Sequence, residues 1–584
     1  MKKTAPTASA APEAAAPLFA NFRQAMTWVH TWFGLALGFV LMVCFYFGAL
    51  SVFDREIDRW AIPATRFAPQ PMPSFDRVLR PAFEALEPDE VDYALNMPTL
   101  HDASQGPMTP RTELPADEYW AYTTHRDPVL RMGAGFAVPH PKDPQGHNHI
   151  HGQTTIDPRS GQPVPEGALK IGSDWFYPLH YSLNWHWHNA GYWVVGLAGM
   201  AMALALLTGI VMHRKVFREF FTFRPAAKLV QRSALDLHNM TGVLALPFHL
   251  FFALTGVLIF AGWMYFPVSQ TVLHPLHERH EARQAQATGL PHQRAGTAAP
   301  LASVDAMMAE ARRRWAARGM PGEVGFLTLH HIGDANGYVS LYRAGSDRVA
   351  LVGQGIHFQA SSGQVLREDP PPGAIAATHE FLTGLHLQHF RHWLLRWLYV
   401  IGGLMGCTCI ATGFLFFVEK RKKQHAKTGS SGARIVDALA TACVTGMVAA
   451  SFAILVANRL LPADLHLAGW DKGEWEKALF WAAWAASACH AIARNAPVAQ
   501  GCISPAWREQ CQAIAALGLA AALLNWITTG DHLIKTVFTH TYWPVAGVDL
   551  CLLTAAAIAA WAARCLRQRA AAQTPAPARK AAHA

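Results

Sequence analysis

Long apolar stretches alternate along this chain with two long polar segments. The pattern predicts eight membrane-spanning helices, because each apolar stretch has about the 20 residues that a helix needs to cross a hydrocarbon layer. We expect four of them at residues 25–53, 191–213, 236–263 and 393–418, and four more within 435–563, at 435–457, 475–493, 510–529 and 545–563. The polar segments, 54–190 and 264–392, are long enough to form water-exposed domains.

Basic residues in two short connections predict the orientation of these helices. The loops 214–235 and 419–434 are expected to be cytoplasmic, since cytoplasmic loops carry an excess of lysine and arginine. Alternation then places both polar segments on the periplasmic side and both termini, 1–24 and 564–584, in the cytoplasm. The basic residues concerned are Arg214, Lys215, Arg218, Arg224, Lys228 and Arg232 in the first loop and Lys420, Arg421, Lys422, Lys423, Lys427 and Arg434 in the second.

Composition supports this mixture of membrane helices and polar domains. Of the 584 residues 51% are hydrophobic and 15% are charged, which is too apolar for an ordinary soluble protein. The formal charge of +9 is mostly explained by the two basic loops, so we expect membrane lipid and no nucleic acid as a partner. Neither polar segment contains any of the nine cysteines, so those domains fold without disulfides. The Ala/Pro-rich first 24 residues predict a disordered tail and not a cleaved signal peptide.

The two polar segments look like a diverged repeat. Each has a helix-like stretch (75–87 and 301–318), an alternating strand (119–124 and 326–329) and then a hairpin (154–162 and 357–364). We therefore expect two small α+β domains. The alternating His147, His149 and His151 could form a metal site, but no nearby carboxylate or cysteine completes a ligand set, so an exposed polar loop is favoured.

The third predicted span carries two histidines, His238 and His249, eleven residues apart. On a continuous helix they share one face, about 16 Å apart along the axis. Gly242, Ala245 and Gly256 lie on the same face and leave room for a flat macrocycle such as a haem. The alternative is that these small residues serve helix packing. Two ionisable groups inside an apolar span are costly, however, unless they have a function.

Further histidines lie at two levels among the first four spans. At the inner level we pair His30 with His238, with His213 as the alternative partner; at the outer level we pair His249 with His386 or His180. Two haems stacked across a membrane require such an arrangement. The alternative is that interfacial histidines only anchor the helices, which we prefer for His188, His389 and His392.

A series of spaced motifs resembles the PepSY-associated transmembrane helix family. The motifs are Trp28–Leu35, Leu179–Leu183, Thr208–Lys215, Phe220–Pro225, Asp236–Asn239, Leu246–His249, Leu385–His386 and Leu395–Tyr399, and Asn525–His532 suggests that the likeness extends into the last spans. The resemblance implies an α-helical polytopic membrane protein of the bacterial inner membrane, with a haem-binding four-helix core and two PepSY-like periplasmic domains.

The resemblance also implies an activity and its ligands. It implies a protein with two b-type haems that reduces ferric siderophores, or other iron complexes, at the periplasmic face and so releases Fe(II). The matching ligand positions are His30, His180, His213, His238, His249 and His386. Arg391 and Arg396 are candidate partners for haem propionates.

Two other function classes remain open from the sequence. One is a PepSY binding or regulatory module that restrains a peptidase or senses the envelope, and the other is a permease for iron, haem or siderophore. The sequence has no Gly-x-Gly-x-x-Gly after a strand and no Walker motif, so electrons for an oxidoreductase would come from a quinol or a separate donor.

Overall fold

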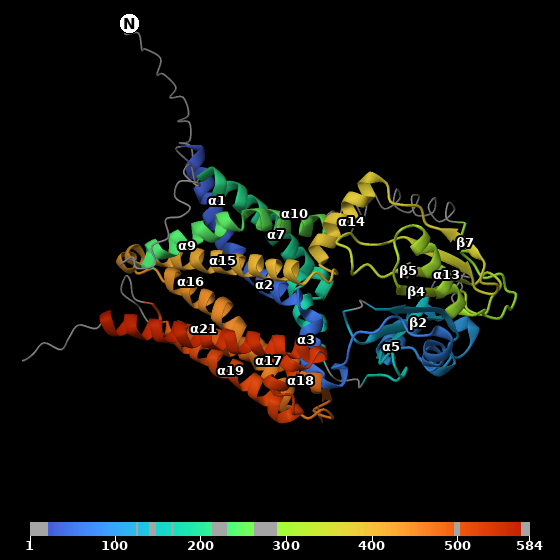
Figure 1. Cartoon of the computed structure of the whole chain (residues 1–584). Coiled ribbons are helices and arrows are strands. Elements are labelled where there is room, and N and C mark those ends of the chain that lie inside the picture. The colour runs from blue at the N-terminus through green and yellow to red at the C-terminus, as the bar shows by residue number, and fades with distance from the viewer. Residues whose placement is uncertain are drawn as a thin grey trace, which may run out of the picture.

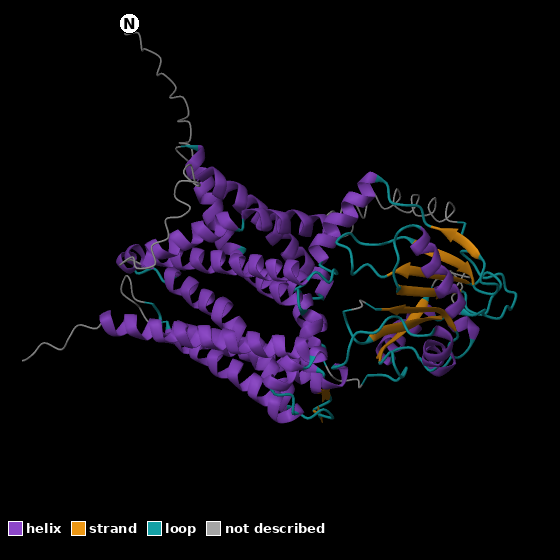
Figure 2. Ribbon diagram, viewed as in Figure 1, coloured by secondary structure: helices purple, strands orange, loops and turns teal. Residues whose placement is uncertain are grey.

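A computed structural model gives the architecture as a helical body with a β-sheet domain at one end (Figures 1 and 2). It describes residues 21–123, 126–138, 148–164, 169–212, 230–261, 289–495 and 503–573. The start of α1 (Phe22–Ala36) and the end of α21 (Trp543–Gln573) lie at the end of the body that is far from the sheet. This arrangement leaves the sheet on a single side of the helices.

Four sequence segments build the first part of the helical body. Two are unbroken helices, α7 (Ala190–Met212) and α15 (Trp393–Thr428). The other two are pairs of helices, in which α1 joins α2 (Gly38–Ser51) at a bend of 60° and α9 (Val230–Leu244) joins α10 (Leu246–Ala261) at a bend of 65°. Pro247 explains the second break, because a proline is tolerated in the first turn of an α-helix but disrupts the interior of one. A new helix, α10, therefore begins beside it. The expectation of one straight face carrying His238 and His249 is therefore wrong.

Five described helices are long and apolar enough to cross a membrane, and each bent pair adds one span, which gives seven. The expected eighth span corresponds to α18 (Lys472–Arg494), a helix of 23 residues that does not meet the same test of length and hydropathy. The protein is thus a multi-pass membrane protein with five to seven candidate spans by this test.

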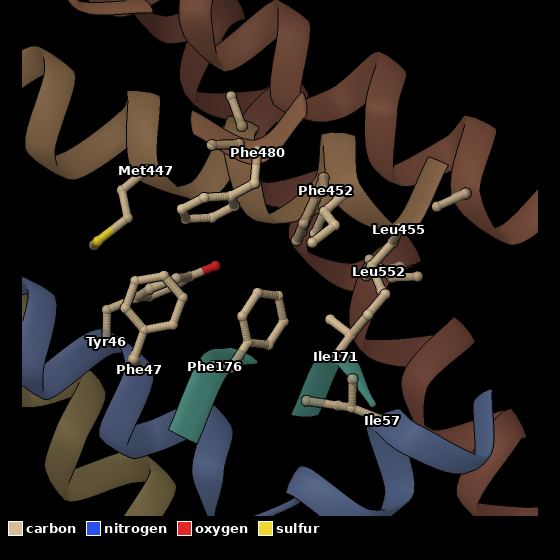
Figure 3. Close-up of a cluster of buried hydrophobic side chains, with 14 of the residues drawn as sticks. Tyr46, Phe47, Ile57, Ile171, Phe176, Met447, Phe452, Leu455, Phe480 and Leu552 are labelled. Atoms are coloured by element: carbon tan, nitrogen blue, oxygen red, sulfur yellow. The ribbon is translucent and has the colours of Figure 1, made fainter. Parts of the chain in front are cut away.

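The C-terminal helices pack as a second group against the first. They comprise α16 (Gly432–Thr441), α17 (Met447–Leu460), α18, α19 (Pro505–Thr529), α20 (Leu533–Phe538) and α21, with a short strand pair, β8 (His466–Leu467) and β9 (Trp470–Asp471). Figure 3 shows the core between the two groups, where Phe47 and Phe176 face Phe480. All three aromatic side chains are almost fully buried, and burial of this kind stabilises by about 1.5–3 kcal/mol for each side chain.

A buried arginine joins the two groups of helices. Arg66 follows α3 (Asp54–Ala61), a helix that comes directly after the first span. Its guanidinium lies 2.6 Å from Asp531 Oδ2 and 2.8 Å from Asn525 Oδ1, and it also donates to the carbonyl of Trp60. Asp531 and Asn525 both lie in the sequence motif Asn525–His532. That motif therefore has a structural role, which is to hold the segment after α3 against α19.

The sheet domain contains one seven-stranded antiparallel sheet with the order β3-β2-β1-β4-β5-β6-β7. The first polar segment supplies three strands and the second supplies four, and β1 pairs with β4 in the middle. The two segments thus form a single sheet and not two separate domains. The strands are β1 (Ala116–Tyr122), β2 (Leu130–Ala137), β3 (His149–Ile156), β4 (Val324–His330), β5 (Tyr338–Arg343), β6 (Gly355–Gln359) and β7 (Val365–Glu368).

Helices on the sheet show the expected repeat. Residues Phe75–Leu79 (η2) with Arg80–Glu84 (α4) and the helix α13 (Val304–Ala317) cover one shared hydrophobic core with the strands. Ser74 and Ser303 each cap the helix that follows. Ser74 donates to Asp305 at 2.5 Å, and Ser303 donates to Asp76 at 2.6 Å. This reciprocal exchange is what a repeat related by an approximate twofold axis produces, so the repeat predicted from the sequence is visible in the fold.

Candidate functional site

Two histidines face each other where the helical body meets the sheet. His180 lies in the short helix α6 (Tyr177–Tyr181), and His386 lies in α14 (Ala374–Leu387). Their ring centroids are 6.2 Å apart and the ring planes differ by 31°. His180 Nδ1 lies 2.8 Å from the carbonyl of Cys44, and His386 Nδ1 lies 2.7 Å from Thr255 Oγ1, which itself donates to the carbonyl of Phe251. We refer to His180 and His386 as the outer pair.

A second pair lies deeper in the helical body. His30 of α1 and His238 of α9 have ring centroids 6.2 Å apart, with ring planes at 82°. His30 Nδ1 lies 2.9 Å from the carbonyl of Ala205 on α7, and His238 Nδ1 lies 2.7 Å from the carbonyl of Cys409 on α15. We refer to His30 and His238 as the inner pair.

The centroid separation of both pairs equals that expected for two imidazoles that bind one metal ion from opposite sides. A metal–nitrogen bond of about 2.0–2.1 Å on each side, with about 1.1 Å from each nitrogen to its ring centre, places the centroids about 6.2–6.4 Å apart. In all four rings Nδ1 is hydrogen-bonded to an oxygen. Such a bond fixes the tautomer and the orientation of a ring that binds a metal through Nε2. The four side chains therefore fit a pair of bis-histidine iron sites.

Glycines lie against the rings at both levels. A β-carbon added to Gly48 would lie 2.8 Å from His180 Nδ1, and one added to Gly256 would lie 3.4 Å from His386 Cε1. At the inner pair the corresponding distances are 3.4 Å between Gly209 and His30 and 3.3 Å between Gly413 and His238. The absence of side chains at these positions lets the rings lie close to the helix backbones.

A cavity of about 380 Å³ surrounds the outer pair. Most of its wall is apolar and comes from α2, α7, α10 and α15, as a site for a large flat ligand requires. Its lining includes Gly48, Gly199, Met202, Phe252, Gly256 and Gly403. The cavity thus gives the outer pair enough room for at least part of a macrocycle.

The end of this cavity nearest the sheet is polar and charged. Arg55 and Arg126 line it beside Tyr122, which belongs to strand β1. Arg55 is itself paired with Asp54 and Asp127, at 3.4 and 3.3 Å. The sequence did not single out these residues, because the two stretches that carry them, 54–55 and 122–127, are far apart in the chain.

Behind Arg55 lies a second buried carboxyl of α3. Asp58 accepts hydrogen bonds from the backbone N–H groups of Gly172 and Ser173, at 2.8 and 3.2 Å. Burial raises the pKa of Asp58 to about 7, although the positive charge of Arg55 acts in the opposite direction.

The two pairs are separated by about one and a half nanometres of helix. On α7, Gly209 contacts the inner pair and Gly199 lines the cavity of the outer pair. On α15, Gly413 and Gly403 have the same roles. Ten residues separate the glycines on both helices, and at 1.5 Å per residue this is about 15 Å.

Comparison with known proteins assigns the part of the chain that holds both pairs. The family profile described as "PepSY-associated TM region" matches residues 27–420, about two thirds of the chain, and includes all four histidines. This chain belongs to that family. A protein of Pseudomonas aeruginosa described as uncharacterized is 27% identical over 390 residues, which cover 62% of this chain and 88% of that protein.

The PepSY-associated region ends at residue 420, before α16 begins. The sheet and both histidine pairs therefore lie inside the region, and the helices α16 to α21 lie beyond it. Arg66, inside the region, contacts Asn525 and Asp531 beyond it. The C-terminal helices are thus attached to the family region through a buried polar contact as well as through the apolar core.

His249, expected as an outer ligand, does not join either pair. Its Nε2 lies 3.3 Å from the carbonyl of Gly402, and its ring packs against Phe45 at 5.2 Å between centroids. The break before α10 explains this placement, because the bend turns His249 away from the line of the α9 face. His213 lies outside the described residues, so its expected place at the inner level is not compared.

Other expected contacts at the outer face differ from the structure. Arg396, a candidate for a haem propionate, is buried and bonded to Glu56 and to the carbonyl of Val52, both at about 2.6–2.8 Å. It therefore holds α15 against the start of α3. His392 accepts from the backbone N–H of Leu395 and begins α15, in agreement with a structural role. His389, in contrast, lines the cavity.

Proposed function

We propose that this protein is a b-haem electron-transfer protein of a bacterial inner membrane. In this proposal it reduces ferric siderophores, or similar ferric complexes, on the side of the membrane that carries the sheet. The observation that carries the proposal is that two histidine pairs occur at two levels of the helical body. The ring centroids are 6.2 Å apart in both. One pair alone has simpler explanations, such as a buried polar contact between helices.

The chain's own residues would prepare both positions for a planar ligand. The oxygens of Ala205, Cys44, Cys409 and Thr255 hold the four rings in one tautomer. The apolar walls exclude water, which raises the strength of these hydrogen bonds. Two histidines at each position would disfavour oxygen binding to a haem held there and would favour electron transfer.

Haem iron, when bound at both pairs, would supply a one-electron carrier at each level. The spacing of about 15 Å between the levels covers about half of a hydrocarbon core about 30 Å thick. The inner pair lies toward the end of α15 that carries Arg421 and Lys422, where basic residues indicate the cytoplasmic face. A quinol or a separate protein would donate electrons there.

The substrate side of the proposal rests on the cavity and the sheet. The cavity of the outer pair ends at Arg55, Arg126 and Tyr122, next to the first strand of the sheet. A ferric complex held at this end would be close to the outer pair. Fe(III) is bound tightly by hard oxygen donors and Fe(II) much less so, and reduction would therefore release the metal from a siderophore.

An absorption spectrum of the purified full-length protein tests the haem part of the proposal. We expect a b-type spectrum with two haems per chain, and a reduced form that ferric siderophores reoxidise while a ferrous chelator traps Fe(II). A colourless protein that gains no haem on reconstitution would refute the proposal and favour the binding module or the permease. A haem protein that no ferric siderophore reoxidises would refute the substrate.

A further inference from the structure

A cluster of carboxylates and imidazoles lies at the other end of the sheet from the cavity. Strand β1 contributes Asp117 and Glu118, β3 contributes His149, and β4 ends at His330, which His331 follows. Tyr122 at the cavity lies four positions after Glu118 on β1, a distance of about 13 Å at 3.3 Å per residue. The cluster is therefore distinct from the histidine pairs of the helical body.

A β-bulge places the two neighbouring carboxylates together. The register of β1 against β2 shifts between Ala116 and Glu118, so Asp117 is the extra residue. Successive residues of a regular strand point to opposite faces, whereas a bulge re-aims one of them. Donor atoms of Asp117, Glu118 and His149 consequently lie within 4.8 Å of one another. Gly135 of β2 lies between Glu118 and His149 and adds no side chain there.

Distances within the cluster fit the edges of a metal coordination shell. His149 Nε2 and His331 Nδ1 lie 3.3 and 3.5 Å from Asp117 Oδ2. Charge-assisted hydrogen bonds between nitrogen and carboxylate are shorter, about 2.7–2.9 Å. Two ligands of a tetrahedral ion with bonds of about 2.0–2.1 Å are about 3.3–3.4 Å apart. Glu118 contributes a further carboxylate, 3.0 Å from His330 Nδ1.

His331 adds a second, independent observation. Its φ angle is +53°, a left-handed conformation that is uncommon for residues other than glycine and that is concentrated at functional sites. The ring is mostly buried, and within the described residues its Nδ1 is a buried atom without a hydrogen-bond partner. Asp117 Oδ2 lies 3.5 Å from this nitrogen, an ion-pair distance that is longer than a direct charge-assisted hydrogen bond.

We propose that Asp117, Glu118 and His149 bind one divalent first-row transition-metal ion, such as Zn²⁺ or Fe²⁺, and that His331, which faces the same Asp117 oxygen, completes the ligand set. Imidazole nitrogen with carboxylate oxygen suits these ions, whereas Mg²⁺ and Ca²⁺ prefer oxygen ligands alone. The inference does not rest on haem binding, because none of the four residues contacts the histidine pairs. No carboxylate lies near His149 in the sequence, and for that reason the sequence favoured an exposed polar loop there. The fold brings two carboxylates, Asp117 and Glu118 of β1, next to His149.

Arg294 is the group that opposes a cation at this position. Its guanidinium contacts Asp117 Oδ1 and donates to the carbonyl of Ile332 at 2.9 Å. The two imidazoles face the other oxygen, Oδ2. A metal ion at Oδ2 would thus share the carboxylate with Arg294. The positive charge of Arg294 would weaken the binding of that ion. Loss of that charge should strengthen metal binding.

Zinc binding to the full-length protein in detergent tests the proposal. Protein is dialysed against Zn²⁺ with a competing chelator, and bound zinc is counted by mass spectrometry. We expect Asp117→Asn and His331→Gln each to lose one zinc per chain, and Arg294→Gln to bind that zinc at least several-fold more tightly. His151→Gln is the matched control, because His151 lies on the same strand as His149 but outside the cluster, where it pairs with Asp92.

A stability measurement guards against misfolding of the variants. Zinc should raise the unfolding temperature of the wild type and of His151→Gln, and should have no such effect on His331→Gln. Hydrogen exchange of β1 and β4 without metal should be unchanged in His331→Gln. Equal zinc content in wild type, Asp117→Asn and His331→Gln would overturn the proposal, and so would weaker zinc binding by Arg294→Gln.

Discussion

Gly48 of α2 lies so close to His180 that an added β-carbon would be 2.8 Å from Nδ1 of the ring. At that distance the ring or the helix must move, because Nδ1 also holds its hydrogen bond to Cys44. The first prediction is that Gly48→Val displaces His180 and removes about half of the haem absorbance. Gly34→Val is the control, since no described atom lies within 4 Å of a β-carbon there. Equal haem loss in both variants would contradict the prediction.

The second prediction separates the paired histidines from the unpaired one. His386→Ala should lose the outer haem and His238→Ala the inner one, each leaving about half of the absorbance. His249→Ala should retain both, because His249 is bonded to the carbonyl of Gly402 and belongs to neither pair. The change in haem content is measured on protein purified from membranes. Loss of half the haem in His249→Ala would restore the role that the sequence suggested.

A third prediction concerns orientation in the membrane. If basic residues set the topology, a reporter fused after Arg232 or Lys423 is cytoplasmic, and one inserted near Gln70 or Gln286 is periplasmic. The sheet and the outer pair would then face the periplasm. Alkaline phosphatase and a fluorescent protein report opposite sides, so each site is tested twice. A periplasmic signal at Lys423 would reverse the proposed direction of electron flow.

The fourth prediction concerns the contact between the two groups of helices. Arg66→Ala removes a buried partner of Asp531 and Asn525, although Asp531 keeps its ion pair with the more exposed Lys535. The loss of one member of a buried charge pair costs at most about 3–5 kcal/mol. We expect a lower unfolding temperature in detergent and faster proteolysis between α15 and α16. Arg494→Ala, which breaks an exposed pair with Glu509, is the control and should change little.

A fifth prediction concerns the acid stability of the sheet. Burial lowers the pKa of His357 in β6, and Asp369, which raises it, does not fully compensate. The pKa of Asp369 is also below its usual value, because hydrogen bonds from Gly355, Arg367 and His357 outweigh its burial. In both cases the unfolded chain binds more protons, so stability is lost as the pH falls, first below about 6.5 and then below about 4.

Hydrogen exchange of β5 and β6 measures this effect locally. Protection should fall between pH 7 and pH 5 in the wild type and stay nearly constant in His357→Gln, after correction for the intrinsic exchange rate. His292→Gln, at an exposed loop position, should behave as the wild type. A wild-type protection that rises toward pH 5 would have the wrong sign.

Local patterns predicted much of this protein correctly. Apolar runs and glycines indicated the long helices, and alternation with turn residues indicated β1, β4 and the hairpin from β6 to β7. The placement of His30 beside His238 also agrees with the expected pairing. These features depend on neighbours in the sequence or on the depth of a residue in a membrane, and both can be estimated from the chain alone.

Features that depend on distant segments were not predicted. The bend at Ala245 removes His249 from the line of His238, and helical periodicity cannot detect a change of axis. The pairing of His180 with His386 requires α6 and α14 to meet across 206 residues of chain. Likewise, the carboxylates near His149 come from another strand, and a bulge decides which way Asp117 points.

The central pairing of β1 with β4 has a consequence for synthesis. Thr328 lies opposite Trp120, so 208 residues must leave the ribosome after Trp120 before its partner exists. At about 5–20 residues per second this takes roughly 10–40 s. During that interval β1 is an open strand edge, which can pair with another chain. A newly made molecule therefore depends on timely insertion of its second and third helical segments, α7 and α9 with α10, which lie between β1 and β4 in the sequence. Slow translation between β1 and β4 would expose it to aggregation.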